Sequence, residues 1–381
     1  MTPASDPKSI DTLPAGATGL LTIDLDTIVA NWRKLSSQAI PADCAAVVKA
    51  DAYGCGITQV SRALAKAGCR TFFVATLDEA RAVREVTPTS TIYVLNGFFP
   101  GSGDQYAKFD CRPVLGDAVE LAEWDAFRTT SGWEGLAAVH VDTGMNRLGF
   151  RIADAQALEA RIKGGKHGFA LVMSHLVNAE MLGDSVNGRQ VAAFREIASL
   201  FSGVPASLAN SSGIFLGSQF HFDLVRPGAA LYGVNPTPEA DTPMQPVVDL
   251  KARVAQVRTI EKGETVGYGG TWTARQQTRL AVISAGYADG YFRAAGGIDN
   301  LRSAEVIAAG QRCPVAGRIS MDLLAIDITA LPPGAIRRGG MVTLIGDGIT
   351  VDELGRHFDT IGYEVLTSLG RRYVRAYKGG A

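Results

Sequence analysis

The chain has 381 residues, of which 46% are hydrophobic, 20% charged and 8% aromatic. These values are typical of a folded globular protein and exclude a disordered or fibrous chain, and the length predicts one or two domains. Its 37 Lys and Arg residues nearly balance its 38 Asp and Glu residues, so no strong positive field favours nucleic acid or an anionic membrane surface. The composition therefore favours a small neutral or zwitterionic ligand.

The five cysteines are scattered, without a Cys-x-x-Cys pair or a Cys/His cluster. Neither a disulfide framework nor a metal site is expected from such spacing. The N-terminal segment MTPASDPKSIDTLPAG has neither the basic start nor the apolar core of a secretory signal. No stretch approaches the ~18 apolar residues of a membrane span. We therefore expect a cytoplasmic protein with buried thiols.

The first 240 residues alternate between short apolar runs and segments with a helical period. A strand over 20–25 comes first, and Asp26 then caps a helix. Eight later runs fit strands: 44–48, 71–75, 91–95, 112–115, 137–141, 170–174, 206–209 and 222–225. Helical patterns between them cover 57–67, 77–86, 118–127, 153–162 and 188–200. Eight parallel strand–helix units close naturally into a (β/α)8 barrel, although the fourth and seventh runs are short.

The segment NPTPEADTPMQ over 235–245 marks a boundary, because it combines three prolines with polar residues and has no period. Beyond it, apolar or alternating runs occupy 248–260, 278–284, 305–308, 313–319, 323–328 and 342–345, and a helical period returns at 351–358. We therefore predict a (β/α)8 TIM barrel over 1–240 and a mainly-β domain over 241–381. Residues before about 26 are expected to pair with the second domain.

Polar residues follow the predicted barrel strands. They are Lys49 after the first strand, Asp142 and Arg147 after the fifth, His175 after the sixth, Asn210 and Ser211 after the seventh and Arg226 after the eighth. The loops that follow the strands of such a barrel meet at one mouth, so these side chains should converge. Lys49 ends a buried run, and desolvation lowers the pKa of a lysine, which suits it to act as a base or to bond covalently with an aldehyde cofactor. A lysine that merely snorkels at a strand end is the structural alternative.

Five separated motifs are VVKADAYGCG, DTGMNRLGF, VRPGAALYG, GYADGY and GRISMD. In order and spacing they resemble the alanine racemase family of pyridoxal-phosphate enzymes, from about residue 19 to EVLTSLGRR near the C-terminus. The resemblance implies a (β/α)8 barrel, a C-terminal β domain and a homodimer in which each active site borrows residues from the partner's second domain. It also implies pyridoxal 5'-phosphate as the cofactor, interconversion of L-alanine and D-alanine by two bases, and supply of D-alanine for peptidoglycan.

The resemblance also implies roles for single residues, and no metal ligand. Lys49 matches the lysine that bonds the cofactor, and it forms the pair of catalytic bases with Tyr287. The implied cofactor-binding residues are Lys49, Tyr53, Arg147, His175, Ser211, Arg226, Gly228 and Ala229. Among these, Arg226 matches an arginine that faces the pyridine nitrogen. Arg147 and Met321 match residues that meet the substrate carboxylate, Met321 from the other subunit. Considered alone, Tyr287 would be a turn tyrosine and His175 a core histidine.

The sequence departs from the family pattern at three points. His140 stands where many members carry a lysine that becomes carbamylated and steadies the arginine matched by Arg147. Ser320 replaces a common cysteine. Arg371 aligns with a phosphate-contacting tyrosine, so either Arg371 or the nearby Tyr373 is the candidate there. Two aromatic residues of VGYGGTW, Tyr268 and Trp272, fit either the active-site entrance or the core of the β domain.

Other activities remain open on the sequence. A racemase for serine or for several amino acids would share every motif. A decarboxylase on this architecture would ordinarily place a carboxylate, and not Arg226, at the pyridine nitrogen. A non-catalytic pyridoxal-phosphate carrier would be a lone barrel without a second domain and without the Tyr287 motif.

Overall fold

The structure, a computed structural model, describes residues 14–299 and 303–380. The chain forms two compact units. One comprises Asp26–Gln245, and the other joins the N-terminal segment up to Leu25 to Pro246–Gly379. Residues 1–13, which belong to the segment expected to pair with the second domain, lie outside the described residues.

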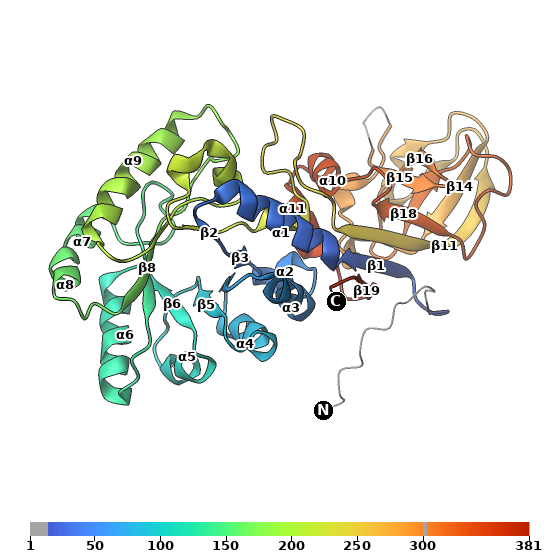
Figure 1. Cartoon of the computed structure of the whole chain (residues 1–381). Coiled ribbons are helices and arrows are strands. Elements are labelled where there is room, and N and C mark those ends of the chain that lie inside the picture. Colours follow the sequence, from blue (N-terminus) through green and yellow to red (C-terminus); the bar gives the residue numbers. More distant parts are fainter. Residues whose placement is uncertain (1–13, 300–302, 381) are drawn as a thin grey trace. The chain divides into compact units, whose positions relative to one another are not determined.

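The first unit is the predicted barrel. Its strands, in chain order, are β2 (Asp43–Cys44), β3 (Ala46–Val47), β4 (Thr71–Val74), β5 (Thr91–Val94), β6 (Arg112–Leu115), β7 (Ala137–His140), β8 (Phe169–Met173), β9 (Ala206–Ser207) and β10 (Leu224–Val225). The strands β3 to β9 form one parallel sheet in sequence order, and β10 pairs in parallel with β2. The N–H of Ala45 donates to the carbonyl of Val225, and that of Val47 to Pro227, each at 2.9 Å. These bonds join the eighth strand to the first, so the (β/α)8 barrel is closed. Figure 1 shows the helices of this unit outside its strands.

The helices of this unit follow the strands around the barrel. They are α1 (Leu25–Ala39), α2 (Lys49–Tyr53), α3 (Ile57–Ala67), α4 (Leu77–Val86), α5 (Gly103–Phe109), α6 (Ala118–Ser131), α7 (Ile152–Gln156), α8 (Glu159–Lys163) and α9 (Ser185–Leu200), with 3-10 turns η1 (Ser212–Leu216), η2 (Ser218–Phe220) and η3 (Ala229–Tyr232). The helix predicted over 153–162 is wrong as one piece. The N–H of Leu158 bonds the carbonyl of Ala155, three residues back, and this tighter turn separates α7 from α8. Within the described ranges, no helix is long and apolar enough to cross a membrane.

Apolar side chains fill the inside of the barrel. One buried cluster takes a side chain from most of the strands: Ala45, Val47, Phe73, Tyr93, Val114, Ala138, Leu171, Met173 and Leu224. The rings of Phe73 and Tyr93 stack with their centroids 4.9 Å apart. The barrel is therefore a packed core and not a channel, which places any chemistry at one of its ends.

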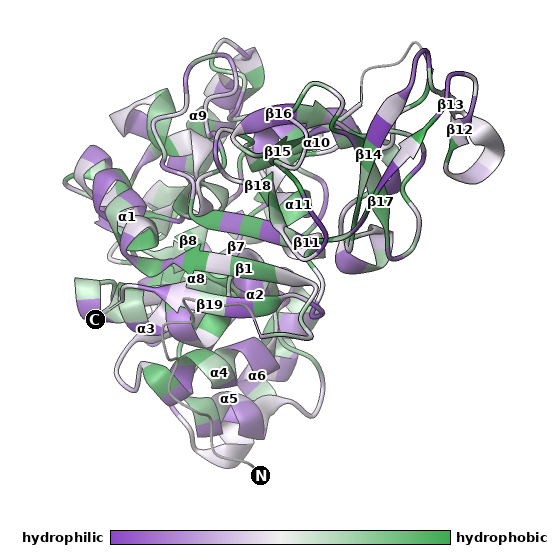
Figure 2. Ribbon diagram, turned by 90° about the vertical axis from the view of Figure 1, so that its right-hand side faces the viewer, coloured by the Kyte–Doolittle hydropathy of each residue, from purple (hydrophilic) through white to green (hydrophobic). Residues whose placement is uncertain are grey.

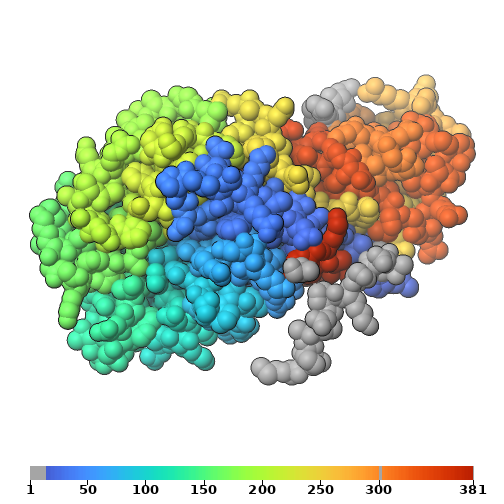
Figure 3. Space-filling view, in the orientation of Figure 1, coloured from blue at the N-terminus to red at the C-terminus, as the bar shows by residue number. Residues whose placement is uncertain are grey.

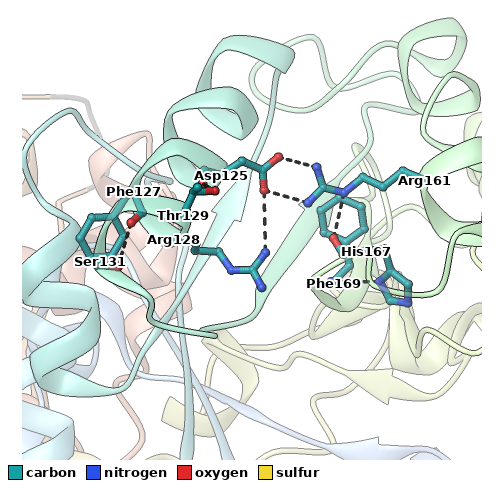
Figure 4. A network of polar contacts seen from close by, with 8 residues as sticks. All are labelled: Asp125, Phe127, Arg128, Thr129, Ser131, Arg161, His167 and Phe169. Carbon is teal, nitrogen blue, oxygen red and sulfur yellow. Dashed lines mark hydrogen bonds and ion pairs between the residues drawn. The ribbon is translucent and has the colours of Figure 1, made fainter.

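A polar network fastens two helices to the amino-terminal end of β8 (Figure 4). The guanidinium of Arg161 on α8 donates to both carboxylate oxygens of Asp125 on α6, and its Nε donates to the carbonyl of His167 at 2.9 Å. The same guanidinium lies 4.8 Å from the ring centroid of Phe169, the first residue of β8. Because the amino-terminal end is the one away from the functional loops, we assign this network to stability.

The first helix closes the barrel unit against its last segment. The amide of Asn31 on α1 donates to the carbonyls of Leu231 and Gln245, at 3.1 and 2.9 Å, and accepts the N–H of Gln245 at 3.0 Å. In the space-filling view, the blue surface of this helix adjoins the yellow surface of the segment that ends the unit (Figure 3). A single buried amide thus joins segments 200 and 214 positions apart in the sequence.

The second unit is mainly β. Its elements are β1 (Gly19–Asp24), β11 (Val248–Ile260), β12 (Thr265–Val266), β13 (Trp272–Thr273), β14 (Thr278–Ile283), β15 (Glu305–Ala308), β16 (Gln311–Pro314), β17 (Leu324–Asp327), β18 (Met341–Ile345), β19 (Val374–Lys378), the helices α10 (Val351–Phe358) and α11 (Gly362–Ser368), and the 3-10 turns η4 (Tyr268–Gly270), η5 (Tyr287–Asp289) and η6 (Arg293–Ala295). The strand β1 pairs antiparallel with β11 and parallel with β19 (Figure 2). The N-terminal strand is thus part of the C-terminal sheet. The sequence did not predict β19, because basic residues interrupt its apolar ones.

The barrel core predicts a clear difference between two phenylalanines. Phe73→Ala should lower the free energy of unfolding by about 3–5 kcal/mol, because it empties a fully buried site beside Tyr93. Phe99 is 64% exposed, so Phe99→Ala should change it by less than about 0.5 kcal/mol. Urea unfolding followed by circular dichroism measures both. Equal losses would contradict the assignment of Phe73 to the core.

Candidate active site

The polar residues predicted to converge all lie at the carboxyl-terminal mouth of the barrel. Lys49 follows β3, Arg147 follows β7, His175 follows β8, Ser211 follows β9 and Arg226 follows β10. The strands are parallel, so their carboxyl-terminal ends share one rim. The sequence order of strands is enough to bring these five side chains to one end of the unit.

Lys49 is half-buried at this mouth. Burial lowers the pKa of its ammonium, and the positive charge of Arg147 lowers it further. The carboxylate of Glu79 acts in the opposite direction and raises it. A lysine with a lowered pKa has a larger neutral fraction, and the neutral amine is the form that acts as a base or nucleophile.

The chain leaves Lys49 through a turn of left-handed helix. Ala50, Asp51, Ala52 and Tyr53 all have φ between 53° and 55°. Each non-glycine residue in this conformation costs about 1–2 kcal/mol. Bonds from outside the turn hold it, since the N–H of Ala50 donates to Glu79 Oε1 at 2.7 Å and Asp51 Oδ1 accepts the N–H of Ile57 at 2.8 Å. Apart from the glycines that follow it, no residue in this segment predicted the turn.

Arg226 is buried at the centre of the site without an anionic partner. Its guanidinium donates to Ser207 Oγ at 2.5 Å and to the carbonyl of Ser174 at 2.6 Å. Burial lowers the pKa of Arg226 to about 9, so the group stays charged near neutral pH. Within the described part of the chain it forms no ion pair. A buried cation held only by neutral acceptors leaves capacity for a further acceptor or an anion.

Ser211 completes a small cradle with the segment after β10. Its Oγ accepts the N–H groups of Gly228 and Ala230 at 3.0 and 3.1 Å. With both lone pairs engaged, the hydroxyl proton is left to donate to an anion. A Cβ on Gly228 would lie 2.4 Å from the hydroxyl of Tyr53, so only glycine fits at that position. The predicted donor Gly228 thus points its N–H at Ser211, whereas no hydrogen bond of the described residues uses the N–H of Ala229.

Arg147 is exposed on a loop that Asp142 shapes. The carboxylate of Asp142 accepts three consecutive N–H groups, from Gly144, Met145 and Asn146, each at 2.8 Å. This carboxylate is therefore engaged by the backbone of its own loop. The mouth as a whole presents the cations Lys49, Arg147 and Arg226, and none of them is paired with a carboxylate among the described residues. Such a site attracts anionic ligands.

Tyr287 and Met321 belong to the second unit, where they are held next to each other. The N–H of Tyr287 donates to the carbonyl of Ser320 at 3.1 Å, and that of Ala288 to Met321 at 3.0 Å. A Cβ on Gly286 would lie 2.3 Å from the Met321 carbonyl oxygen, so glycine is required for this approach. Both side chains remain exposed, Tyr287 by 43% and Met321 by 51%.

Arg372 connects the two segments that carry Tyr287 and Met321. Its guanidinium lies 2.6 Å from the carboxylate of Asp322 and 3.5 Å from that of Asp289. The two aromatic residues of VGYGGTW have different surroundings. Tyr268 is 69% exposed and lines a cavity of about 450 Å³ together with Arg318 and Ser320. Trp272 packs on an apolar cluster. Trp272 is therefore a half-buried residue that packs against the core of the β unit, whereas Tyr268 is exposed.

Two family models match the chain, the alanine racemase N-terminal domain over residues 23–236 and the alanine racemase C-terminal domain over 247–377. The chain belongs to the alanine racemase family.

The similarity to close relatives extends over almost the whole chain. The alanine racemase of Methylobacterium nodulans is 54% identical over 361 residues, which are 95% of this chain and 96% of that protein. A catabolic alanine racemase of Mesorhizobium japonicum is 46% identical and matches over 96% of this chain and 95% of its own length. The crystal structure of an alanine racemase from Bartonella henselae, with covalently bound pyridoxal phosphate, superposes with a TM-score of 0.88 at 40% identity, over 95% of this chain and 100% of that one. The protein is thus an enzyme of the isomerase class, as the members of this family are.

His140 and His175, at the mouth of the barrel, are neutral near pH 7. Burial, then the charges of Arg226 and Arg147, lower the pKa of His175 to about 3. Burial and Arg226 lower the pKa of His140 to about 4, with Asp142 opposing. A neutral imidazole at His140 cannot provide the negative charge expected from a carbamylated lysine at its position, and the positive charge of Arg147 acts on this ring without such a counter-charge.

His140 predicts a pH dependence of stability. Its pKa falls from an ordinary 6.5 in the unfolded chain to about 4 in the folded one, so below pH 6.5 the unfolded state binds more protons and the folded state loses stability. The loss between pH 7 and pH 5 should therefore be about 2 kcal/mol larger for the wild type than for His140→Asn. Urea unfolding at the two pH values measures the difference, and parallel losses in the two proteins would show that His140 is not buried as a neutral ring.

Proposed function

We propose that the chain interconverts L-alanine and D-alanine with pyridoxal 5'-phosphate as cofactor, using Lys49 and Tyr287 as bases on opposite faces of the α-carbon. One observation carries this proposal: a lysine of lowered pKa lies at the same barrel mouth as a buried arginine that forms no ion pair among the described residues. The cofactor has an aldehyde that an amine can bond, an aromatic nitrogen that a guanidinium can donate to, and a phosphate that a cationic site attracts.

The residues of the mouth fit such a group. The Ser211 hydroxyl, the N–H of Ala229 and the hydroxyl of Tyr53 would hold the phosphate. Arg226 would donate to the pyridine nitrogen, because it has hydrogen-bond capacity beyond Ser207 and Ser174. Lys49 would bond the aldehyde carbon. Bound in this way, the cofactor supplies an electron sink for the charge left when the α-carbon loses its proton.

The proton steps belong to the chain's own residues. Racemisation removes a proton from one face of the α-carbon and returns one to the other face, which requires two groups on opposite sides. The lowered pKa of Lys49 suits it to take up or release that proton near neutral pH. Tyr287 is exposed on its own unit and thus available to a second surface. We propose that this surface is the barrel mouth of the partner in a homodimer, with Met321 arriving beside Tyr287.

The substrate carboxylate would meet Arg147 and the backbone N–H of Met321. The guanidinium of Arg147 is exposed at the mouth and makes no ion pair within the described residues. Of the two candidates near the C-terminus for a phosphate contact, Tyr373 is buried in the β unit with only 3% exposure. Arg371 is exposed, and we assign the contact to it.

The arginine at the pyridine nitrogen separates this proposal from a decarboxylase. A guanidinium keeps its proton near neutral pH, so Arg226 would donate a hydrogen bond to the pyridine nitrogen without protonating it. Lys49 or Tyr287 would then return a proton directly to the α-carbon. This favours faithful return of the proton over other reactions of the same cofactor.

Lys49 provides the direct test of the cofactor. Borohydride added to the chain with pyridoxal phosphate should fix a pyridoxyl group on the Lys49 peptide, which mass spectrometry identifies. Lys49→Ala should lose this label, its yellow colour and racemisation, whereas Lys66→Ala, at an exposed position of α3, should keep all three. A label on another lysine, or no label on the wild type, would refute the cofactor assignment.

Subunit mixing tests whether the site is shared. Lys49→Ala and Tyr287→Phe should each be inactive alone, because each lacks one base at both sites. Exchanged subunits should recover up to about a quarter to half of wild-type activity, since a mixed dimer carries one intact site. Lasting inactivity after exchange has been verified by mass spectrometry would argue against shared sites.

Growth and substrate tests address the finer role. We propose that the D-alanine supplies peptidoglycan from the cytoplasm; the five free, buried thiols suit a reducing compartment. A strain lacking the gene should then require D-alanine for growth. Failure only to use alanine as a nutrient would favour the catabolic role named for the Mesorhizobium relative. Chiral chromatography after incubation with L-alanine, L-serine and L-lysine discriminates alanine specificity from the broad-specificity alternative.

A further inference from the structure

Glu79 uses its two carboxylate oxygens on two different loops of the barrel mouth. Its Oε2 accepts the N–H groups of Ala75 and Thr76, at 2.8 and 3.3 Å, in the loop after β4. Its Oε1 accepts the N–H of Ala50 at 2.7 Å, in the loop after β3 and directly beside Lys49. One side chain thus joins the lysine loop to the neighbouring strand.

The first of these contacts is ordinary helix capping. Thr76 and Glu79 form a capping box at the start of α4, with each side chain bonded to the backbone of the other. A capping box needs only one oxygen of the glutamate. The other oxygen is free for a tertiary contact, and it reaches a residue 29 positions earlier in the chain.

The contact with Ala50 lies at the start of four successive residues with left-handed backbone. Ala50 is the first of the four left-handed residues that follow Lys49. Its N–H, held by a carboxylate, makes a charge-assisted bond, which is stronger than a bond between neutral groups. The bond therefore fixes the peptide that immediately follows the Lys49 Cα and limits the directions that the lysine stem can take.

A second glutamate of the barrel makes the same kind of contacts, at loops that carry no proposed site residue. Glu120 on α6 follows the cap Asp117, and its carboxylate accepts the N–H of Gly116 at 2.6 Å after β6 and that of Phe98 after β5. Glu79 and Glu120 thus occupy equivalent places in two helices and fasten equivalent pairs of loops. Glu120 provides a matched control, because its loops carry none of the residues assigned to the site.

We propose that Glu79 is a positioning residue for Lys49, whose carboxylate holds the left-handed turn in place and sets the direction of the lysine side chain. The inference rests on the proposed role of Lys49 but concerns a residue outside the family motifs described above. An amide cannot replace the carboxylate, since a glutamine presents one acceptor and one donor to two sets of N–H groups. In either orientation, one loop faces a donor instead of an acceptor.

The charge of Glu79 has a second effect on Lys49. The groups that act on this ammonium are Arg147, which lowers its pKa along with burial, and Glu79, which raises it. His175 also lies within electrostatic reach but is neutral near pH 7. Loss of the Glu79 charge should therefore lower the pKa of Lys49 further. Loss of the Glu120 charge, by contrast, should leave the pKa of Lys49 unchanged.

The experiment compares Glu79→Gln with Glu120→Gln in the full chain freed of pyridoxal phosphate. Hydrogen exchange read by mass spectrometry should become about tenfold faster or more over residues 49–56 in Glu79→Gln, because an unpaired N–H replaces a charge-assisted bond. In Glu120→Gln, the faster exchange should appear at 97–99 and leave 49–56 unchanged.

Acetic anhydride labelling of Lys49 across pH should shift to lower pH only in Glu79→Gln. Glu79→Asp keeps the charge but is too short to span both loops. Its Lys49 labelling curve should therefore stay near that of the wild type, whereas its hydrogen exchange over 49–56 should be as fast as in Glu79→Gln.

The outcomes separate this inference from the proposed function. Unchanged exchange over 49–56 and an unchanged Lys49 labelling curve in Glu79→Gln would overturn the role of Glu79. Equal changes at 49–56 in Glu120→Gln would also overturn it, because they would show a general loosening of the mouth. Both measurements use protein without cofactor, so they stand even where borohydride labels no Lys49 in the wild type, which would refute the cofactor assignment alone.

Discussion

The buried positive charge of Arg226 is the constraint on which the barrel mouth depends. Removing a guanidinium from water costs several kcal/mol unless acceptors and opposite charges compensate. Here the acceptors are neutral, Ser207 Oγ and the Ser174 carbonyl, and the nearest histidines are driven to their neutral forms. The folded barrel therefore holds an electrostatic imbalance that an anionic ligand relieves, and binding of such a ligand should stabilise the fold by mass action.

The carboxylates near this mouth do not neutralise its positive charges. Asp142 and Glu79 lie within reach of the cations, yet the backbone N–H groups of the surrounding loops occupy both carboxylates. A carboxylate engaged in this way shapes a loop and tunes a neighbouring pKa without forming an ion pair that a ligand must break. The positive charges remain available for phosphate and carboxylate groups, whereas the negative charges serve the scaffold.

Much of this could be predicted from sequence, and the failures have physical causes. The ranges of α3, α4 and α10 follow from strong apolar periods bounded by caps such as Thr76, and the rim residues follow from the rule that parallel strands end together. The break between α7 and α8 and the strand β19 depend on local bonding and on neighbouring strands. The contact of Glu79 with Ala50 could not be predicted, because Thr76-Leu77-Asp78-Glu79 is a complete capping box by itself. Only the fold shows where its second oxygen goes.

The two units solve the same problem by different means. A side chain that moves protons must have a fixed origin and a free end, so other groups have to hold its backbone. In the barrel, the Glu79 carboxylate holds the turn after Lys49. In the β unit, backbone bonds to Ser320 and Met321 and the absence of a Cβ at Gly286 hold the turn of Tyr287, and Arg372 ties its far side to Asp322. In each case other residues hold the backbone of the proposed base, which leaves the Lys49 amine and the Tyr287 phenol without a structural task. Gly286 and Ser320 lie within the motifs GYADGY and GRISMD, so in the β unit the motifs extend beyond the residues that would touch a substrate.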